Sequence, residues 1–397
     1  MPTLESLPPP PDGLVGWPWT SASAPWTPTP EAPLPRISIV TPSFNQAEFI
    51  EETIRSVLLQ GYPNLQYIII DGGSIDGTKA ILEKYGTWLD FWVSETDDGQ
   101  SDAINKGLNR CDGEWFNWLN SDDYLFPGAL QVLGTAARTT SNPIISGVTR
   151  NVGSPQGRSE YAARVGPFWP DLLFNLGVNQ PGSLLRASSV RSVGAVRKDL
   201  SLCMDLDLWL RLALGHGPGA ILEIPQVLAA YRYHPASKTC RQKDAFAYEE
   251  FCLITALAAS LGSLPAELSD TLGFLAATKR YAFSSPHKIE AKRAELAYLD
   301  RILVSDSLLF RAIASQPALA SDPATPFLQA LLRLRPALGR HFDAAEVARI
   351  ETRALVNALE SLGRPDLRMS ARVMMASPTV GNFVNLARIA YQNYSRF

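Results

Sequence analysis

The sequence predicts an α/β protein with a mostly parallel central sheet flanked by helices, followed by a C-terminal helical region. Two observations support this. Between residues 36 and 120, short apolar runs typical of strands alternate with segments whose apolar residues recur at helical spacing. After about residue 241 the strand pattern fades, and segments rich in Ala, Leu and Arg indicate helices. We therefore divide the 397 residues into a proline-rich arm (1–35), an α/β domain (36–240) and a helical region (241–397).

The elements of the α/β domain follow one another with short turns. The predicted strands are RISIVTP (36–42), QYIIID (66–71), DFWVSE (90–95) and EWFNWLN (114–120). The predicted helices are FIEETIRSVLLQ (49–60), TKAILEKYG (78–86) and SDAINKGL (101–108). Asn45, with Glu48 three residues on, predicts a cap for the first helix. This alternation indicates a parallel sheet, in which ligands bind beyond the carboxyl ends of the strands.

The bulk composition restricts the class of protein. The net charge of −3 argues against a nucleic-acid partner. Four cysteines without C-x-x-C spacing suggest reduced thiols in a cytoplasmic protein. No apolar run in the sequence has the length of a membrane span, so the membrane contact that remains open is peripheral contact with the inner membrane surface. Assembly into a homo-oligomer also remains open. The arm holds eleven of the thirty prolines and three tryptophans, so it is either a flexible tail or an extended segment that docks.

Acidic residues at two predicted strand ends are candidates for ligand binding. Asp71 ends a strand and enters a glycine-rich turn, where it could accept a hydrogen bond from a ligand N–H. The alternative is a turn in which Ser74 or Asp76 caps the next helix. The sequence Asn120-Ser121-Asp122-Asp123 follows another strand, and its oxygen ligands favour Mg²⁺ or Mn²⁺. Here the alternative is a solvated acidic turn.

A third candidate lies in the segment MDLDLWLR, which we expect to be helical. Asp207 and Arg211 are four residues apart and predict a surface ion pair. Asp205 shares its predicted face with Leu208 and Trp209, and a carboxylate on an apolar face can act as a base because its pKa is raised. The alternative is that Asp205 caps the helix.

These motifs and their order resemble family 2 of the glycosyltransferases, which have the GT-A fold. The segments that carry the resemblance are TPSFNQAEFIEETIRSVLLQGYPN, YIIIDGGSIDGT, DDGQSDAINKGLNRCDGEWFNWLNSDD, MDLDLWLRLA and LAAYRYHPASKT. They cover about residues 36–240. The resemblance implies an enzyme that moves a sugar from a nucleotide-diphosphate donor (a UDP-, dTDP- or GDP-sugar) to a glycan or lipid-linked acceptor, with Mn²⁺ or Mg²⁺ as cofactor.

The resemblance also assigns roles residue by residue. The positions that match the family's nucleotide-sugar site are Thr41, Pro42, Phe44, Asn45, Asp71, Gln100, Ser101, Asp102, Asn105, Asn120 and Ser121. Asp122 matches the main ligand of the metal-binding D-x-D motif, and His234 matches a late histidine near the metal or the phosphates. Asp205 matches the catalytic base.

Two positions depart from the family pattern. Asn120 replaces the first aspartate of D-x-D, and Met204 replaces the acidic residue that usually precedes the base. The resemblance predicts an inverting, metal-dependent, non-processive glycosyltransferase of polysaccharide or glycan biosynthesis, since the processive signature Q-x-x-R-W is absent from the sequence. The alternatives are a catalytically silent nucleotide-sugar-binding module and a sugar nucleotidyltransferase. The second would need a basic phosphate loop after the first strand, where the sequence reads PSFNQ.

Overall fold

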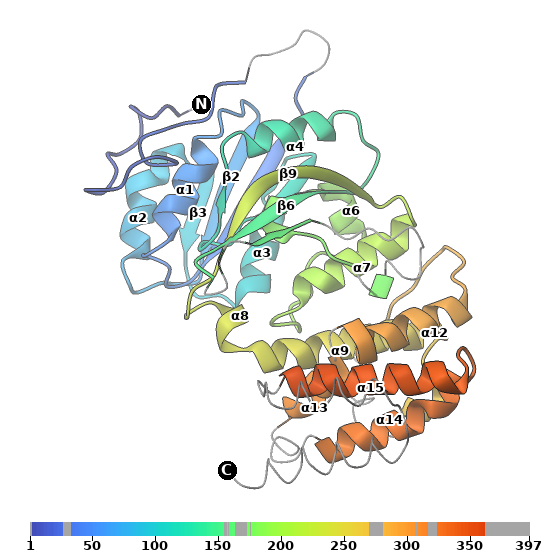
Figure 1. The fold of residues 1–397 in the computed structure, drawn as a ribbon. Coiled ribbons are helices and arrows are strands. Elements are labelled where there is room, and N and C mark those ends of the chain that lie inside the picture. The colour runs from blue at the N-terminus through green and yellow to red at the C-terminus, as the bar shows by residue number, and fades with distance from the viewer. Residues whose placement is uncertain are drawn as a thin grey trace, which may run out of the picture. The chain divides into compact units, whose positions relative to one another are not determined.

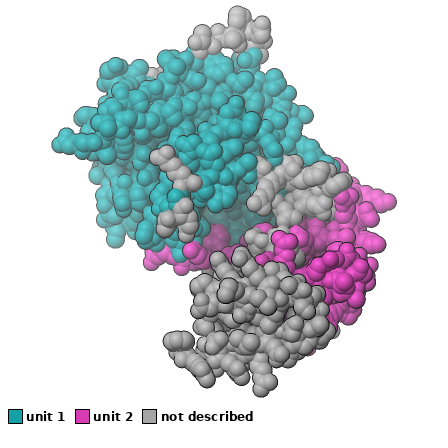
Figure 2. All heavy atoms as spheres, viewed as in Figure 1, with its two compact units in different colours: residues 1–165, 176–240 teal, residues 166–175, 241–397 magenta. Residues whose placement is uncertain are grey.

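The computed structural model describes residues 2–26, 33–154, 157, 159–162, 173–174, 176–269, 281–305, 308–316 and 324–361. The chain forms two compact units, which Figure 2 colours separately. The first unit comprises Met1–Val165 and Leu176–Cys240, and the second comprises Gly166–Asn175 and Arg241–Phe397.

The first unit contains a mixed sheet with strand order β3-β2-β1-β4-β8-β6-β9-β5, and β7 pairs with β6 (Figure 1). The strands are β1 Ile37–Ser43, β2 Leu65–Asp71, β3 Phe91–Ser94, β4 Trp115–Trp118, β5 Tyr124–Leu125, β6 Ile144–Val152, β7 Ser159–Tyr161, β8 Ser183–Arg186 and β9 Ile221–Arg232. Strands β1 to β4 pair in parallel, as their alternation with helices predicts. Strand β8 is antiparallel to β4 and β6, whereas β9 is parallel to β6. The α/β fold class predicted from the sequence is confirmed, with a mixed sheet in place of the mostly parallel one expected.

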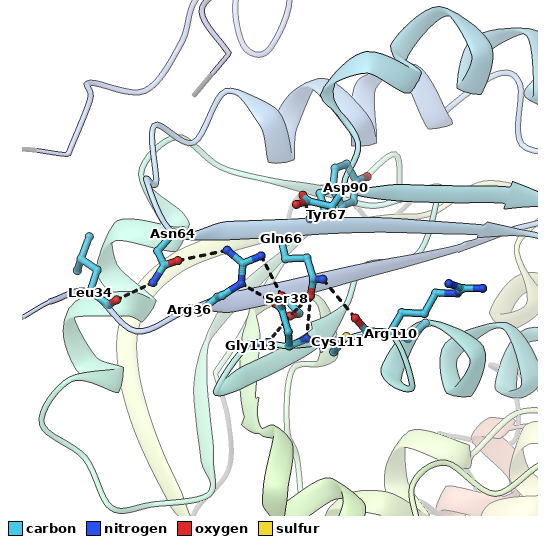
Figure 3. Close-up of polar contacts among 12 residues, drawn as sticks. Leu34, Arg36, Ser38, Asn64, Gln66, Tyr67, Asp90, Arg110, Cys111 and Gly113 are labelled. Carbon is cyan, nitrogen blue, oxygen red and sulfur yellow. Dashed lines mark hydrogen bonds and ion pairs between the residues drawn. The ribbon is translucent and has the colours of Figure 1, made fainter.

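Hydrogen bonds at the amino-terminal edge of the parallel strands fix their register (Figure 3). The hydroxyl of Ser38 on β1 donates to Gln66 Oε1 on β2 at 2.6 Å and accepts from the Gly113 N–H at 2.9 Å. Arg36 forms a two-pronged ion pair with Asp112, with N–O distances of 2.5 and 3.2 Å. These side chains join β1, β2 and the segment that leads into β4, so the carboxyl ends of the three strands come out together at the opposite edge.

Helices cover both faces of this sheet. In Figure 1, α1, α2 and α4 lie on one face and α3, α6 and α7 on the other. Their bounds are α1 Ile50–Leu58, α2 Thr78–Tyr85, α3 Gln100–Leu108, α4 Ala129–Ala137, α6 Ala187–Ser192 and α7 Met204–His216, with 3-10 turns at Gly86–Trp88 and Gln180–Gly182. The three helices predicted before residue 120 are present as α1, α2 and α3. The cap predicted for the first helix is wrong, because α1 begins after Phe49 without a side-chain cap, and Asn45 has a left-handed φ of 52° in the preceding loop.

The N-terminal arm packs against α1 over its described residues, which fits the docking interpretation. The guanidinium of Arg55 on α1 is fully buried and donates to the carbonyl oxygens of Pro8, Pro18 and Trp19 at 2.8, 3.1 and 3.0 Å. The side chains of Leu7 and Trp19 are buried as well. A buried arginine needs its donors satisfied, so the carbonyls of the arm complete the environment of Arg55.

The second unit is helical in its described residues, which confirms the helical region predicted at the C-terminus. Its helices are α9 Lys243–Ser260, α10 Ala266–Ser269, α12 Ala291–Asp300, α13 Leu308–Ala314, α14 Ala324–Gly339 and α15 Ala344–Ser361, with a π-helical turn at Arg301–Ser305, and the short α8 Lys238–Arg241 precedes them. Arg335 pairs with Glu351, and Arg340 pairs with Glu267 and Glu295. None of the helices in the described ranges combines the length and the apolar content that crossing a bilayer requires.

The four cysteines differ in exposure. Cys111, Cys203 and Cys252 are buried free thiols, and Cys240 is half-buried. Burial raises the pKa of the Cys111 thiol to about 11.

Candidate active site

Asp71 is the centre of a hydrogen-bonded turn at the carboxyl edge of the sheet. Its β2 position is in register with Ser43 on β1 and Ser94 on β3. The carboxylate is fully buried and accepts hydrogen bonds from the Ser74 N–H at 2.9 Å, the Ser74 hydroxyl at 2.5 Å and the Ser94 hydroxyl at 2.6 Å. The buried hydroxyl of Ser43, in register beside it, has no hydrogen-bond partner among the described residues. An unpaired buried hydroxyl at a strand end is a feature that a bound ligand would explain.

The loop after β1 is tied to the loop after β2. The Asn45 N–H donates to Ser74 Oγ at 2.7 Å, and the Ile75 N–H donates to Asn45 Oδ1 at 3.0 Å. Phe44 and Ile75 leave 61% and 92% of their surface exposed on these two loops. Two exposed apolar side chains on loops next to Asp71 offer a surface on which a planar ring can lie.

Asp76 does not cap α2, whose N-cap residue is Gly77 without a side-chain cap, but it supports the turn that precedes the helix. Its Oδ1 accepts from the Thr78 N–H at 3.1 Å and from the Thr78 hydroxyl at 2.7 Å, at the start of α2. Burial alone would raise the pKa of Asp76, but hydrogen bonds from Ala47 and Thr78 together hold it below its ordinary value. Asp76 therefore stabilises the turn, whereas Ser43 and Asp71 are the last residues of β1 and β2.

Thr41 and Pro42 lie inside β1 rather than in the loop that follows it. Both are buried, Thr41 Oγ1 lies 3.1 Å from the Tyr67 hydroxyl, and Pro42 is in register with Ile70. These two residues support the loop that carries Phe44 and Asn45.

Helix α3 divides the four residues expected on it between two surfaces. Ser101 Oγ donates to the Leu200 carbonyl at 3.4 Å, and the Asn105 amide exchanges hydrogen bonds with the backbone of Val196 at 2.7 and 3.1 Å. Asp102 pairs with Lys198 and Lys106, and the hydrogen bond from Lys198 is the main reason that the pKa of Asp102 is lowered. Ser101, Asp102 and Asn105 therefore hold residues 196–200, the segment that leads to α7. Gln100 alone of the four contacts the acidic loop.

Gln100 and Asn120 begin a polar network in that loop. The Gln100 amide nitrogen donates to Asn120 Oδ1 at 2.8 Å, and the Asn120 amide nitrogen donates to Asp123 Oδ2 at 3.2 Å. Lys238 extends the network, because its ammonium donates to Gln100 Oε1 at 2.8 Å and to the Ser201 carbonyl at 3.3 Å. Lys238 was not singled out in the sequence, and it brings a positive charge to this edge.

Asp122 and His234, the two residues expected to hold a metal, lie together. Asp122 Oδ2 is 3.0 Å from His234 Nε2, across 112 positions of sequence. Their side chains are 20% and 11% exposed, and the His234 ring packs on Phe49 with centroids 4.5 Å apart. The neighbouring Asp123 is only 1% exposed. Burial, followed by repulsion from Asp122, raises the pKa of Asp123 well above its ordinary value.

The backbone of the acidic loop is held from two sides. Thr53 Oγ1 on α1 lies 2.9 and 2.6 Å from the carbonyl oxygens of Ser121 and Asp123. Arg232 at the end of β9 donates through its backbone N–H to Asp123 Oδ1 at 2.9 Å and through Nε to the Asp122 carbonyl at 2.8 Å. Neither Thr53 nor Arg232 was predicted as a site residue; the only sequence signal for Arg232 is its place in the Arg-Tyr-His segment.

Helix α7 places its two aspartates differently from the expectation. Asp207 is fully buried, and its Oδ2 accepts from Arg211 Nε and Nη2 at 2.8 and 2.6 Å. The predicted ion pair is therefore present, but the prediction that it is a surface pair is wrong. Asp205 is half-buried on the second residue of the helix, and its Oδ1 accepts from the Leu206 N–H at 2.8 Å. The residue at the N-cap is Cys203, so Asp205 is not the cap.

The donor set at Asp122 suits a hard divalent ion that also binds a ligand. Among the described residues, no group of three or more His, Cys, Asp or Glu side chains is arranged to hold a metal. One carboxylate and one imidazole are a sufficient protein contribution where phosphate oxygens and water complete the octahedral shell of Mg²⁺ or Mn²⁺. Asp122 and His234 fit such an ion together with a diphosphate.

Comparison with known proteins is consistent with this geometry. Residues 38–186 match the model of the family described as glycosyl transferase family 2. An uncharacterized glycosyltransferase of Mycobacterium tuberculosis is 29% identical over 185 residues, which are 45% of this chain and 70% of that protein. TuaG of Bacillus subtilis, a glycosyltransferase named for teichuronic acid biosynthesis, is 39% identical over 92 residues, 22% of this chain and 36% of TuaG. The chain spans about a third of the length of the first relatives that it matches.

Solved structures share the fold. The crystal structure of S. aureus TarS in complex with UDP-GlcNAc superimposes with a TM-score of 0.52 at 14% identity, over 90% of this chain and 92% of that chain. The GT-A fold expected from the sequence is confirmed.

Proposed function

We propose, from the premise that residues 38–186 of this chain belong to glycosyl transferase family 2, that the protein is an inverting, metal-dependent, non-processive glycosyltransferase. It moves one sugar from a nucleotide-diphosphate donor to a hydroxyl of a glycan or lipid-linked acceptor, in polysaccharide or glycan biosynthesis. The observation that carries this proposal is the meeting of Asp122 and His234, 3.0 Å apart, beside a loop fixed by both α1 and β9.

The nucleoside end of the donor fits the edge around Asp71. The base of a UDP-, dTDP- or GDP-sugar would lie on the loops of Phe44 and Ile75, with its N–H groups toward the carboxylate of Asp71. Asp71 Oδ1 accepts from the Ser74 hydroxyl, and because the carboxylate is fully buried, the turn that carries Ser74 would have to move for the base to reach it. Ser43 would gain a partner in the same step.

The diphosphate fits the edge around Asp122. Asp122 and His234 would hold the Mn²⁺ or Mg²⁺, which offsets the charge that develops on the leaving diphosphate. Lys238, held by Gln100 and Ser201, would bring a second positive charge to the phosphates.

The acceptor hydroxyl requires a base, and we assign this role to Asp205, on the first turn of α7, because the resemblance predicts it. Its carboxylate would take the proton of the hydroxyl while the oxygen forms a bond to the anomeric carbon and the bond to the diphosphate breaks. Attack from the side opposite the leaving group inverts the configuration and needs no covalent enzyme intermediate. Ser201, four residues before Asp205, contacts Lys238, so the segment before the base is tied to the phosphate end of the site.

The test combines donor binding and turnover. Calorimetric titration with UDP and Mn²⁺, followed by assays of donor hydrolysis and transfer with a panel of nucleotide sugars, should show binding and release of the nucleoside diphosphate. Asp122→Asn and excess EDTA should each abolish turnover. The matched control is Asp12→Asn, whose side chain is exposed in the N-terminal arm and should leave turnover unchanged. Binding without any turnover would instead favour the silent nucleotide-sugar-binding module, and full activity in EDTA would remove the metal from the mechanism.

A further inference from the structure

The side chain of Asn120 makes two hydrogen bonds with opposite requirements. Its amide nitrogen donates to Asp123 Oδ2 at 3.2 Å, and its oxygen accepts from Gln100 Nε2 at 2.8 Å. The other oxygen of Asp123 accepts from the Arg232 N–H at 2.9 Å. Both oxygens of Asp123 are therefore acceptors, and residue 120 must be a donor on one side and an acceptor on the other.

Of an amide and an ionised carboxylate, only the amide meets both requirements at this position. An aspartate at 120, as in the family's D-x-D motif, could still accept from Gln100 but would bring a carboxylate oxygen to face Asp123 Oδ2. Asp123 cannot turn away to water, because its side chain is 1% exposed and its other oxygen is held by Arg232. Two ionised carboxylate oxygens in contact repel each other, and such a pair could form a hydrogen bond only after it took up a proton.

The network through Asn120 reaches the groups that act on the donor. Gln100, oriented by Asn120, accepts from the ammonium of Lys238 at 2.8 Å. Asp123, on the other side, is bound by Arg232, which also holds the carbonyl of Asp122. A change at Asn120 therefore moves Lys238 through Gln100, and moves Asp122 through Asp123.

We infer that Asn120 is a positioning residue whose amide is required, so that restoring the family's aspartate at this position impairs the site. The inference rests on the proposed function for the roles of Asp122 and Lys238. The pairing of Asn120 with Asp123 stands on the hydrogen bonds alone.

An exchange of the two side chains provides the test, because it preserves every hydrogen bond. In Asn120→Asp with Asp123→Asn, residue 123 still accepts from Arg232 and now donates to residue 120, which still accepts from Gln100. The total charge is also unchanged. Each single variant breaks the match: Asn120→Asp sets two acceptors face to face, and Asp123→Asn sets two donors face to face.

The four proteins of this cycle are compared by kcat and KM for the donor and by thermal unfolding. We expect Asn120→Asp to lower kcat/KM about tenfold to a hundredfold, and the exchange variant to recover to within about threefold of the parent. Recovery of kcat would separate positioning from a general loss of folded protein, which Tm reports. Full activity of Asn120→Asp, or an exchange variant as impaired as the two single changes combined, would overturn the inference.

The cycle also separates this inference from the proposed function. If the parent protein neither binds UDP with Mn²⁺ nor turns over any nucleotide sugar, the proposed function fails. The Tm values then decide the amide pairing by themselves. Non-additive losses that the exchange reverses would support it, and additive losses would overturn it.

Discussion

At the scale of single residues, α7 shows how two aspartates in one helical turn take different parts. Asp205 is half-buried at the second helical position, where its carboxylate accepts from the Leu206 N–H. Asp207 is fully buried against Arg211. The sequence predicted the i,i+4 pair but placed it on the surface, because helical periodicity gives relative faces and does not say which face the rest of the chain covers.

Asp205→Asn should lower kcat by about 10² to 10⁴, because the amide cannot accept the proton of the acceptor hydroxyl. Donor affinity and Tm should stay close to those of the parent, since an amide oxygen can still accept from the Leu206 N–H. Steady-state kinetics and thermal unfolding measure both. The control is Glu223→Gln, an exposed carboxylate on β9. Retention of most of the turnover in Asp205→Asn would mean that another group is the base.

Arg211→Met should destabilise the fold by about 3 to 5 kcal/mol, because it leaves the buried carboxylate of Asp207 without its partner. Arg211 also donates to the carbonyls of Val193 and Ala195, which lose those bonds.

Burial raises the pKa of Asp207, so the folded state binds a proton more tightly than the unfolded state does. The loss of stability should therefore shrink as pH falls through the raised pKa. Urea unfolding at pH 7 and pH 5 tests this, and an equal loss at both pH values would contradict it.

At the scale of elements, the sequence predicted the first half of the sheet better than the second. Strands β1 to β4 are continuous apolar runs separated by amphipathic helices, which is the pattern of buried parallel strands. Strand β9 was not predicted, because Pro225 and exposed charged and polar positions interrupt its apolar pattern. The pairing of β9 with β6 contains register shifts. Strand β6 therefore shows no simple alternation of apolar and polar residues either.

Gly107→Ala tests the close packing of α3 on β1. A Cβ at Gly107 would lie 2.3 Å from a methyl carbon of Val40, whose side chain is fully buried. The helix would have to move, at a cost of about 1 to 3 kcal/mol. In contrast, Gly215→Ala in α7 adds a methyl group with no atom within 4 Å and should be neutral or slightly stabilising. Chemical denaturation of both variants provides the comparison, and equal stabilities would show that α3 adjusts freely.

At the scale of the whole molecule, the site is built from contacts that no local pattern reveals. The resemblance to a known family brought out Asp122 and His234, which lie 112 positions apart and meet in the structure. The supporting residues Thr53, Arg232 and Lys238 could not be predicted, because each acts through contacts with residues 68 to 138 positions away. Side chains that support a site have no motif of their own, and only the fold brings them into place.

Removal of residues 1–26 should lower the stability of the first unit although it removes no candidate site residue. The arm buries Leu7 and Trp19, and its carbonyls accept from Arg55. We expect a loss of about 3 to 5 kcal/mol, mainly from the exposed apolar surface. Val15→Ser, at a residue that is 77% exposed in the same arm, should have no effect. An unchanged unfolding midpoint after the truncation would show that the docked arm contributes little.

The unequal burial of the four thiols makes the chain suitable for site-selective labelling without any prior mutation. A maleimide dye added to the native protein should modify Cys240, since Cys111, Cys203 and Cys252 are enclosed by the core. Cys240 belongs to α8, two residues after Lys238, at the point where the chain passes from one unit to the other. A fluorophore at that position would report by its anisotropy whether a nucleotide sugar alters the freedom of the junction, and so give a binding signal that does not depend on turnover.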